Sequence, residues 1–250
     1  ASFRFYAELN DFLPPEKRAQ EFDCFFNTPQ SVKHLIESCG VPHTEVDLVL
    51  VNGRSEDFSA VVSNGDRVSV YPVFEAFDIS GVSRVRPEPL RRIRFVADAH
   101  LGRLAVYLRM FGFDTLYYND AGDEELAGIS SRQRRVLLTR DRELLKRRQI
   151  THGCCVRESA FRAQLIEVLE RFDLAASVLP FSRCLRCNGT LEEISRPQAR
   201  PHVPLRSLAY ADRFQRCRLC GRVYWNGSHY RRMQRYVEGV MSRLWRERGS

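Results

Sequence analysis

Three aspartates stand at places in the chain where carboxylates could hold a metal ion. Asp98 follows the apolar run 93–97, Asp141 lies just after the apolar run 136–139, and Asp123 lies in an acidic stretch. Carboxylates that come close together repel one another unless a cation offsets their charge. Mg²⁺ and Mn²⁺ are hard, oxygen-seeking ions that suit such a site. We therefore treat Asp98, Asp123 and Asp141 as candidate ligands of a catalytic divalent metal.

The elements that would position these acids alternate between strand and helix. Strands are expected at 93–97, 115–118, 136–139 and 150–156. Helical spacing of apolar residues follows the first strand and ends at Gly112, and a covering helix is expected at 159–172. This alternation predicts βαβ crossovers, an α/β fold and a parallel sheet whose strands end at one edge. We expect the three aspartates to converge there, because ligands bind at that edge.

Each aspartate also has a purely structural interpretation. Asp at the end of a strand is a common turn residue and helix N-cap, so one such residue alone decides little. Asp141 lies between Arg140 and Arg142, and capping requires neither arginine. The conjunction of three acids after three expected strands favours the metal site.

Around these acids the chain resembles the Mut7-C ribonuclease domain, a member of the PIN-like nuclease fold. The segments that carry the resemblance are 95–98, 101–105, 108–114, 123–126 and 137–144, and 137–142 (Leu-Leu-Thr-Arg-Asp-Arg) is the most specific. The resemblance covers about residues 92–235. It implies a metal-dependent ribonuclease with Asp98, Asp123 and Asp141 as ligands, and with Asp120 and Glu143 as weaker candidates. Glu143 stands where the general PIN pattern has a second Asp.

Two Cys-x-x-Cys pairs form the strongest local pattern. They are Cys184 with Cys187 and Cys217 with Cys220, each with a glycine just past the second thiol. Four thiolates at this spacing are typical of a zinc ribbon that holds structural Zn²⁺, since they fill the coordination shell. Two disulfides are the competing interpretation, which a cytosolic setting disfavours. The long gap between the pairs predicts a substantial loop that leaves the ribbon and returns.

Arginines and aromatic residues interleave between and after these pairs. The set comprises Arg196, Arg200, Arg206, Arg213, Arg216, Arg218, Arg222, Tyr210, Phe214, Tyr224 and Trp225. Guanidinium groups bind phosphates, and aromatic rings stack on unpaired bases. The residues that we expect to contact RNA are Arg103, Arg109, Arg216, Arg218, Arg222, Tyr224 and Trp225. Alternatively, Tyr224 and Trp225 pack the ribbon against the sheet.

Charge is distributed unevenly along the chain. The protein has 250 residues, 44% of them hydrophobic, and a net charge of +8. Residues 1–90 hold 8 Lys and Arg against 14 Asp and Glu, and the remainder holds 31 against 17, so the two parts carry −6 and +14. The basic part is expected to meet a polyanion, the alternative being a solvated basic surface.

No apolar run of membrane-spanning length and no secretory leader is visible. We therefore expect a globular, cytoplasmic protein without a membrane partner.

The first 80 residues are expected to form a small domain of strands around one helix. Strands are expected at 2–7, 47–51 and 67–73, and a helix begins near Thr28 and ends at Gly40. The pair Asn52-Gly53 is typical of a type I′ hairpin. Segments 41–45, 51–53 and 65–72 resemble the ubiquitin-like, β-grasp domain often fused to Mut7-C. Sulfur carriers of this fold need a terminal Gly-Gly, which 74–78 lacks, so we expect a module that docks a protein partner.

These patterns together predict four segments. They are a β-grasp domain at 1–80, a linker at 81–91, a PIN-like nuclease core at 92–178, and a zinc ribbon with a basic C-terminal helix at 179–250. The expected activity is Mg²⁺- or Mn²⁺-dependent hydrolysis of single-stranded or flexible RNA, in which Arg140 or Arg142 could offset phosphoryl charge. The alternative is an RNA-binding adaptor whose nuclease site no longer works.

Overall fold

The structure is a computed structural model that describes the chain except for residues 73–81, 86–89, 91 and 249–250. The chain forms two compact units. The first unit joins Ala1–Ile93 to Ala121–Cys155, and the second joins Arg94–Asp120 to Val156–Ser250. Each unit therefore uses two separate stretches of chain. Most of the expected linker at 81–91, and all of segment 74–78, lie outside the described residues.

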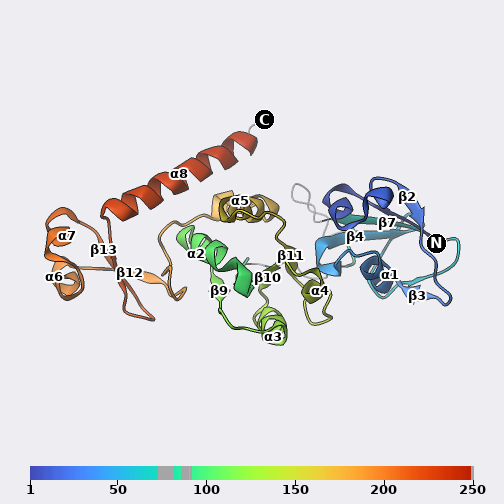
Figure 1. The fold of residues 1–250 in the computed structure, drawn as a ribbon, viewed down its shortest axis with the longest axis horizontal. Coiled ribbons are helices and arrows are strands. Elements are labelled where there is room, and N and C mark those ends of the chain that lie inside the picture. The colour runs from blue at the N-terminus through green and yellow to red at the C-terminus, as the bar shows by residue number, and fades with distance from the viewer. Residues whose placement is uncertain (73–81, 86–89, 91, 249–250) are drawn as a thin grey trace. The chain divides into compact units, whose positions relative to one another are not determined.

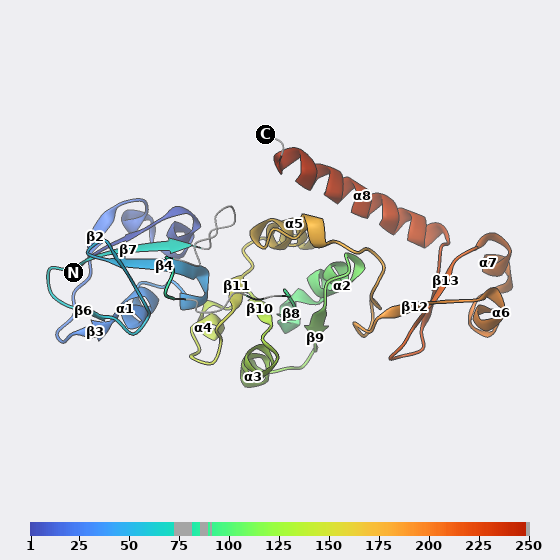
Figure 2. The same ribbon diagram turned by 180° about the vertical axis from the view of Figure 1, so that it is seen from behind.

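A five-stranded sheet forms the N-terminal part of the first unit. Its order is β2-β1-β7-β4-β5. The strands are β1 (Ser2–Phe5), β2 (Glu21–Asp23), β4 (Val46–Val51), β5 (Arg54–Glu56) and β7 (Arg67–Pro72). β1 and β7 pair in parallel, whereas the other neighbours are antiparallel. The helix α1 (Val32–Ser38) lies beside β4 and β7 (Figures 1 and 2), which is the β-grasp arrangement.

Local sequence signals in this part lead to the expected structures. The side chain of Ser31 caps α1 by accepting a hydrogen bond from His34 N at 3.3 Å, and the helix ends before Gly40, at φ +94°. Asn52 and Gly53 have φ values of +51° and +79°, which the type I′ turn between β4 and β5 requires. A further small ladder joins β3 (Gln30–Ser31) to β6 (Val61–Val62). The expected hairpin is confirmed. The expected helix forms and ends before Gly40, but it begins at Val32 rather than near Thr28, because Gln30 and Ser31 belong to β3.

The C-terminal stretch of the first unit contains parallel strands that alternate with helices. It contains α3 (Asp123–Gln133), β10 (Val136–Thr139), α4 (Arg142–Leu145) and β11 (Gly153–Cys155). All residues of β10 and β11 are buried, and the two strands pair in parallel. Apolar runs of this kind are typical of parallel strands that are covered on both faces.

The N-terminal module packs directly on β11 through the short 3₁₀ turn His43–Glu45. The buried His43 places Nε2 2.8 Å from the carbonyl oxygen of Ile150 and Nδ1 2.7 Å from Glu37 Oε1. Glu45 Oε1 accepts a hydrogen bond from Cys155 N at 2.6 Å, and Glu45 is fully buried. The N-terminal module and β11 therefore belong to one compact unit, and the expected segment borders remain a prediction.

The second unit begins with another parallel pair of strands. It contains β8 (Phe95–Ala97), α2 (Gly102–Met110), β9 (Thr115–Tyr117) and α5 (Phe161–Arg171), with β8 parallel to β9. Tyr107 of α2 contacts Phe161 of α5, with ring centroids 4.8 Å apart. Tyr236 of α8 (Ser228–Arg248) contacts Tyr107 at 5.3 Å. The expected alternation of strand and helix, and the mixed α/β class with a β-grasp domain, are confirmed.

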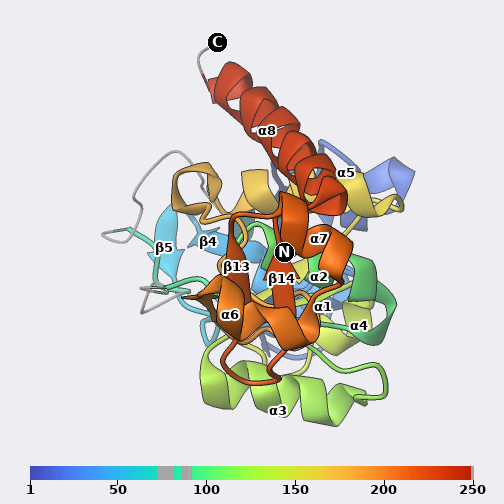
Figure 3. The same ribbon diagram turned by 90° about the vertical axis from the view of Figure 1, so that its left-hand side faces the viewer.

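An antiparallel three-stranded ribbon forms the C-terminal part of the second unit. Its order is β12 (Leu191–Ile194), β13 (Phe214–Cys217) and β14 (Val223–Trp225). The long segment between the cysteine pairs contains β12 and two short helices, α6 (Arg196–Ala199) and α7 (Leu205–Tyr210), which lie beside β13 and β14 in Figure 3.

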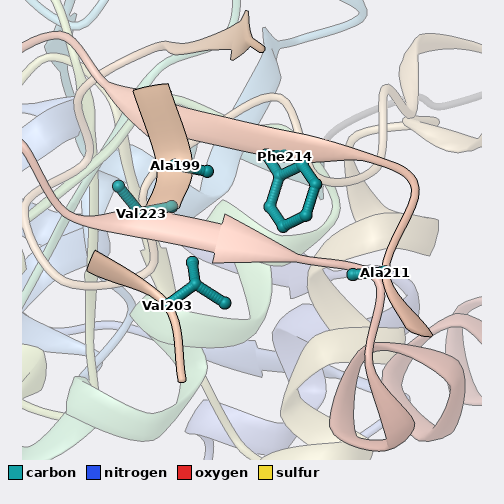
Figure 4. Packing of buried hydrophobic residues seen from close by; sticks show 5 residues of the cluster. All are labelled: Ala199, Val203, Ala211, Phe214 and Val223. Carbon is teal, nitrogen blue, oxygen red and sulfur yellow. The ribbon is translucent and has the colours of Figure 1, made fainter. Parts of the chain in front are cut away.

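This segment shares a small hydrophobic core with the strands of the ribbon. Figure 4 shows its buried members, which are Ala199, Val203, Ala211, Phe214 and Val223. The expectation of a loop was incomplete, because these residues bury the insertion against the ribbon. Among the described residues, no helix is both long and apolar enough to cross a membrane.

Candidate metal centres and nucleic-acid interface

Asp141 stands directly after β10, where its carboxylate is held by the backbone. Its Oδ1 accepts hydrogen bonds from Glu143 N at 2.8 Å and Leu144 N at 3.2 Å, which makes it the N-cap of α4. Its own N–H donates to Thr139 Oγ1 at 2.9 Å. Both bonds fall on one oxygen, and Oδ2 accepts none from the described residues. The structural role of Asp141 is therefore compatible with metal ligation through Oδ2.

The other candidate metal ligands in the first unit, Asp123 and Glu143, are exposed and paired with basic residues. Asp123 is the first residue of α3, after the N-cap Gly122, and its Oδ2 lies 3.2 Å from Arg147 Nη2. Glu143 pairs with Lys146 at 2.7 Å. Exposed ion pairs of this kind are weak, so a metal ion that binds the carboxylates could displace their basic partners.

The two arginines beside Asp141 differ in their surroundings. Arg140 is exposed. Arg142 lies over the ring of Phe12, with Cζ 4.8 Å from the centroid, and its guanidinium donates to the Phe12 carbonyl oxygen at 3.4 Å. The N-terminal module therefore holds Arg142 in place.

Asp98 and Asp120 lie in the second unit, separately from Asp123, Asp141 and Glu143. Asp98 follows β8 and is the N-cap residue of a 3₁₀ turn, Ala99–Leu101, without a side-chain capping bond. Asp120 is exposed after β9. The convergence of Asp98, Asp123 and Asp141 at one site remains a prediction.

The four cysteines of the ribbon do come together. The Sγ atoms of Cys184, Cys187, Cys217 and Cys220 all lie within 4.8 Å of one another. Two of these separations are 3.4 Å, between Cys187 and Cys217, and 3.7 Å, between Cys184 and Cys220. None of the four forms a disulfide. This cluster confirms the expected grouping and offers four soft ligands at one point, the donor set that suits Zn²⁺.

Tight turns bring the thiols together. The N–H of Asn188 donates to Cys184 O at 3.0 Å, and the N–H of Gly221 donates to Cys217 O at 3.0 Å. In the first turn the left-handed residue is Asn188, at φ +68°, whereas in the second it is Gly221, at φ +71°. Gly189 is required for space, because a Cβ there would lie 2.8 Å from Cys217 Sγ.

The proton affinities of the thiols diverge within this cluster. Burial opposes ionisation of Cys184, but a hydrogen bond from the Tyr224 hydroxyl and the backbone N–H groups of Cys187 and Arg186 lower its pKa to about 6. Burial and the neighbouring thiols raise the pKa of Cys187 to about 12. Without a cation Cys184 is thus easier to ionise than Cys187, an imbalance that a bound metal ion would relieve.

Arg109 has a structural role that the sequence analysis did not predict. The side chain is 4% exposed and donates to the carbonyl oxygens of Thr115 at 2.9 Å, Leu185 at 3.1 Å and Arg186 at 2.9 Å. It therefore joins β9 to the first cysteine turn. The sequence does contain a signal for this burial. Arg109 lies four residues after the core residue Ala105, which places it on the same face of the helix.

Two of the other expected RNA contacts are paired with one acid. Arg216 and Arg218 bind the two oxygens of Glu192, at 3.0 and 3.1 Å. Arg103 is exposed and lies over the ring of Phe161, at 5.7 Å. Trp225 packs against the small core of the ribbon itself, which is a different contact from the expected packing of the ribbon against the sheet.

A groove in the second unit, with a volume of about 910 Å³, gathers the remaining candidates. Its walls include Arg222, Tyr224 and Trp225, together with Arg206 and Tyr210 of α7. Arg186 and Arg231 also line the groove, although they were not among the residues expected to contact RNA. Arg186 lies inside the first Cys-x-x-Cys pair, a position that could have drawn attention to it.

Comparison with known families gives two matches. Residues 93–237, more than half of the chain, match the Mut7-C RNAse domain, and residues 1–78 match the Mut7-C ubiquitin domain. No curated protein and no solved structure is significantly similar to the chain.

Proposed function

Since the chain belongs to the Mut7-C RNAse domain family, we propose that it is a ribonuclease that depends on Mg²⁺ or Mn²⁺ and hydrolyses single-stranded or flexible RNA. The observation that carries this proposal is the match over 93–237, because it spans the whole set of acids at the strand ends. The basic charge of residues after 90 supports RNA as the substrate.

In this proposal Asp98, Asp123 and Asp141 hold the catalytic ion, and Asp120 and Glu143 are additional candidates. Carboxylate oxygens are the ligands that Mg²⁺ and Mn²⁺ prefer, and Oδ2 of Asp141 is available for such a bond. A divalent ion at such a site activates the attacking water and offsets charge on the departing oxygen. The exposed Arg140 would bind a phosphoryl oxygen of the substrate, whereas Arg142 would brace the turn through Phe12.

The thiol cluster has a separate task in this proposal. Zn²⁺ held by Cys184, Cys187, Cys217 and Cys220 has a closed coordination shell and therefore supports the fold of the ribbon without taking part in hydrolysis. The N-terminal module docks a protein partner, as its ubiquitin-like family suggests.

The test compares Asp141→Asn with the parent on labelled RNA, with and without Mn²⁺. Asn caps a helix as well as Asp, so the variant keeps α4 while it removes the negative charge. We expect cleavage to fall roughly a hundredfold or more. The matched control is Glu124→Gln, which removes an exposed charge next to Asp123 in the first turn of α3 and should cleave at the parent rate. A folded Asp141→Asn protein that cleaves normally would refute the assignment.

An RNA-binding adaptor is the second candidate. The ion pair of Asp123 with Arg147 and the capping role of Asp141 are contacts that these acids would keep in a protein without activity. The same assay separates the two functions. Binding of RNA by the parent without cleavage in either Mg²⁺ or Mn²⁺ would favour the adaptor.

A further inference from the structure

The walls of the groove in the second unit come from several separate parts of the chain. They are α2, residues 181–186 around the first cysteine turn, α7, the strands of the ribbon and the first turns of α8. The volume of about 910 Å³ is near the upper end of the range for pockets that enclose ligands of drug size, a class that includes nucleotides.

The charge of the walls has one sign. Five arginines line the groove, and its lining residues include no Asp or Glu. Arg183 is paired with Asp114, at 3.4 Å. The other four form no ion pair with any of the described residues, and they are Arg186, Arg206, Arg222 and Arg231. Guanidinium groups that converge without acids to offset them attract an anion, and their planar donors suit phosphate oxygens.

Aromatic side chains stand among these arginines. Tyr210 on α7 is 84% exposed, although a tyrosine usually hides most of its ring. Phe181 and Tyr230 form a pair in the wall, with centroids 4.6 Å apart, and Trp225 lies at the end of β14. Rings that are accessible beside cationic groups offer faces on which unpaired bases can stack.

From this combination we propose that the groove binds a short stretch of single-stranded RNA, with phosphates on Arg186, Arg206, Arg222 and Arg231 and a base stacked on Tyr210. This inference rests on the proposed ribonuclease function and adds the place where the substrate is gripped. A duplex is excluded from this arrangement, because its bases are already stacked on one another and it is recognised across its outer grooves. An acidic peptide would use the arginines but not the exposed ring.

Under this proposal the arginines of the ribbon differ in how much they contribute to RNA binding. Arg216 and Arg218 share Glu192 and lie outside the groove, so they contribute less to RNA binding than the four arginines of the walls. In the part of the chain that the structure describes, the four have no acidic partner of this kind to release.

The experiment measures binding of a short labelled oligouridylate to the full chain by fluorescence anisotropy. No Mg²⁺ or Mn²⁺ is added, and the RNA is recovered intact afterwards, so the readout is independent of cleavage. We expect Tyr210→Ala to weaken binding about fivefold or more, whereas Tyr210→Phe, which keeps the ring, binds as the parent does. Arg206→Ala should weaken binding. It should also reduce the slope of log K against the logarithm of the salt concentration by about one.

The matched control is Arg213→Ala, which removes an equal charge from the same ribbon. Arg213 is exposed, paired with Glu193 at 2.7 Å and outside the groove, so its loss should change binding little. Unchanged binding by both Tyr210→Ala and Arg206→Ala would overturn the proposal, as would equal losses in all three variants. Preferential binding of duplex RNA, or full competition by polyglutamate, would also overturn it. If the variants contradict the groove proposal but the parent cleaves RNA normally, only the groove proposal is refuted. If the variants behave as expected but the parent does not cleave RNA, only the ribonuclease proposal is refuted.

Discussion

Asn188 has two functions in the first cysteine turn. It adopts the left-handed backbone at φ +68°, and its buried amide accepts from Thr115 N at 3.0 Å and donates to Asp114 Oδ1 at 2.8 Å. Gly would provide the backbone conformation without the hydrogen bonds. The turn that holds Cys184 and Cys187 is thus attached to β9 through one side chain.

Replacing Asn188 with Ala should lower the free energy of unfolding of the second unit by roughly 2–4 kcal/mol. About 1–3 kcal/mol comes from the Thr115 N–H, which loses its buried acceptor, and the rest comes from the left-handed backbone. Urea denaturation of the zinc-loaded protein measures this loss. Asn188→Gly removes the backbone strain, so it should recover part of the loss; a Gly variant that is less stable than the Ala variant would contradict this explanation.

Some residue roles could be inferred from the sequence and others could not. The capping ability of Asp141 was visible in its position after a strand, and the structure shows it. The burial of Arg109 and of Glu45 depends on carbonyl and amide groups that other parts of the chain supply. A sequence pattern says which face of a helix is apolar, but it does not show which polar group will find a partner inside.

At the scale of the elements, periodicity located the strands and helices of the nuclease fold well. The insertion between the cysteine pairs was harder, because α6 and α7 are short and their apolar residues show no sustained period. Their burial becomes visible only when Phe214 and Val223 of the ribbon complete the core. The ribbon and its insertion therefore depend on each other.

Zinc and catalysis should separate when individual ligands are replaced. Cys217→Ser should release zinc, destabilise the ribbon and weaken RNA binding, because metal binding and folding are coupled in such elements. Asp98→Asn should abolish cleavage and keep its zinc, because a carboxylate outside the thiol cluster is not a ligand of that ion. Metal analysis of the purified proteins provides the measurement. Loss of zinc from Asp98→Asn would show that the ligands are misassigned.

At the scale of the whole molecule, the N-terminal module has a structural task besides any docking. Its turn His43–Glu45 supplies the acceptor for Cys155 N in β11 and a donor to the carbonyl oxygen of Ile150, both in the nuclease part of the chain. The sequence predicted only a linker at 81–91 between this module and the nuclease core. Sequence reasoning missed the contact because polar residues at a buried junction have no periodic pattern.

Glu45→Ala should therefore destabilise the nuclease part although residue 45 lies in the ubiquitin-like module. The loss should be about 1–3 kcal/mol, since the buried N–H of Cys155 loses its acceptor. Thermal unfolding, monitored by the loss of cleavage activity, measures this loss of stability. Glu45→Gln keeps an acceptor oxygen and should unfold closer to the parent. RNA affinity should stay unchanged in both variants, and a parallel loss of affinity would mean that the module contacts the substrate.

The interleaving of the two compact units affects how the protein folds as it is synthesised. The chain enters the first unit, leaves it at Ile93, returns at Ala121, and leaves it again at Cys155. A domain made from one continuous stretch can fold as soon as it emerges from the ribosome. Here His43 and Glu45 are synthesised long before Ile150 and Cys155, which are their hydrogen-bond partners. Until then the nascent N-terminal module keeps these polar groups exposed to water. Final packing of both units is thus a late event, and a ribosome that stalls before residue 150 would leave neither unit complete.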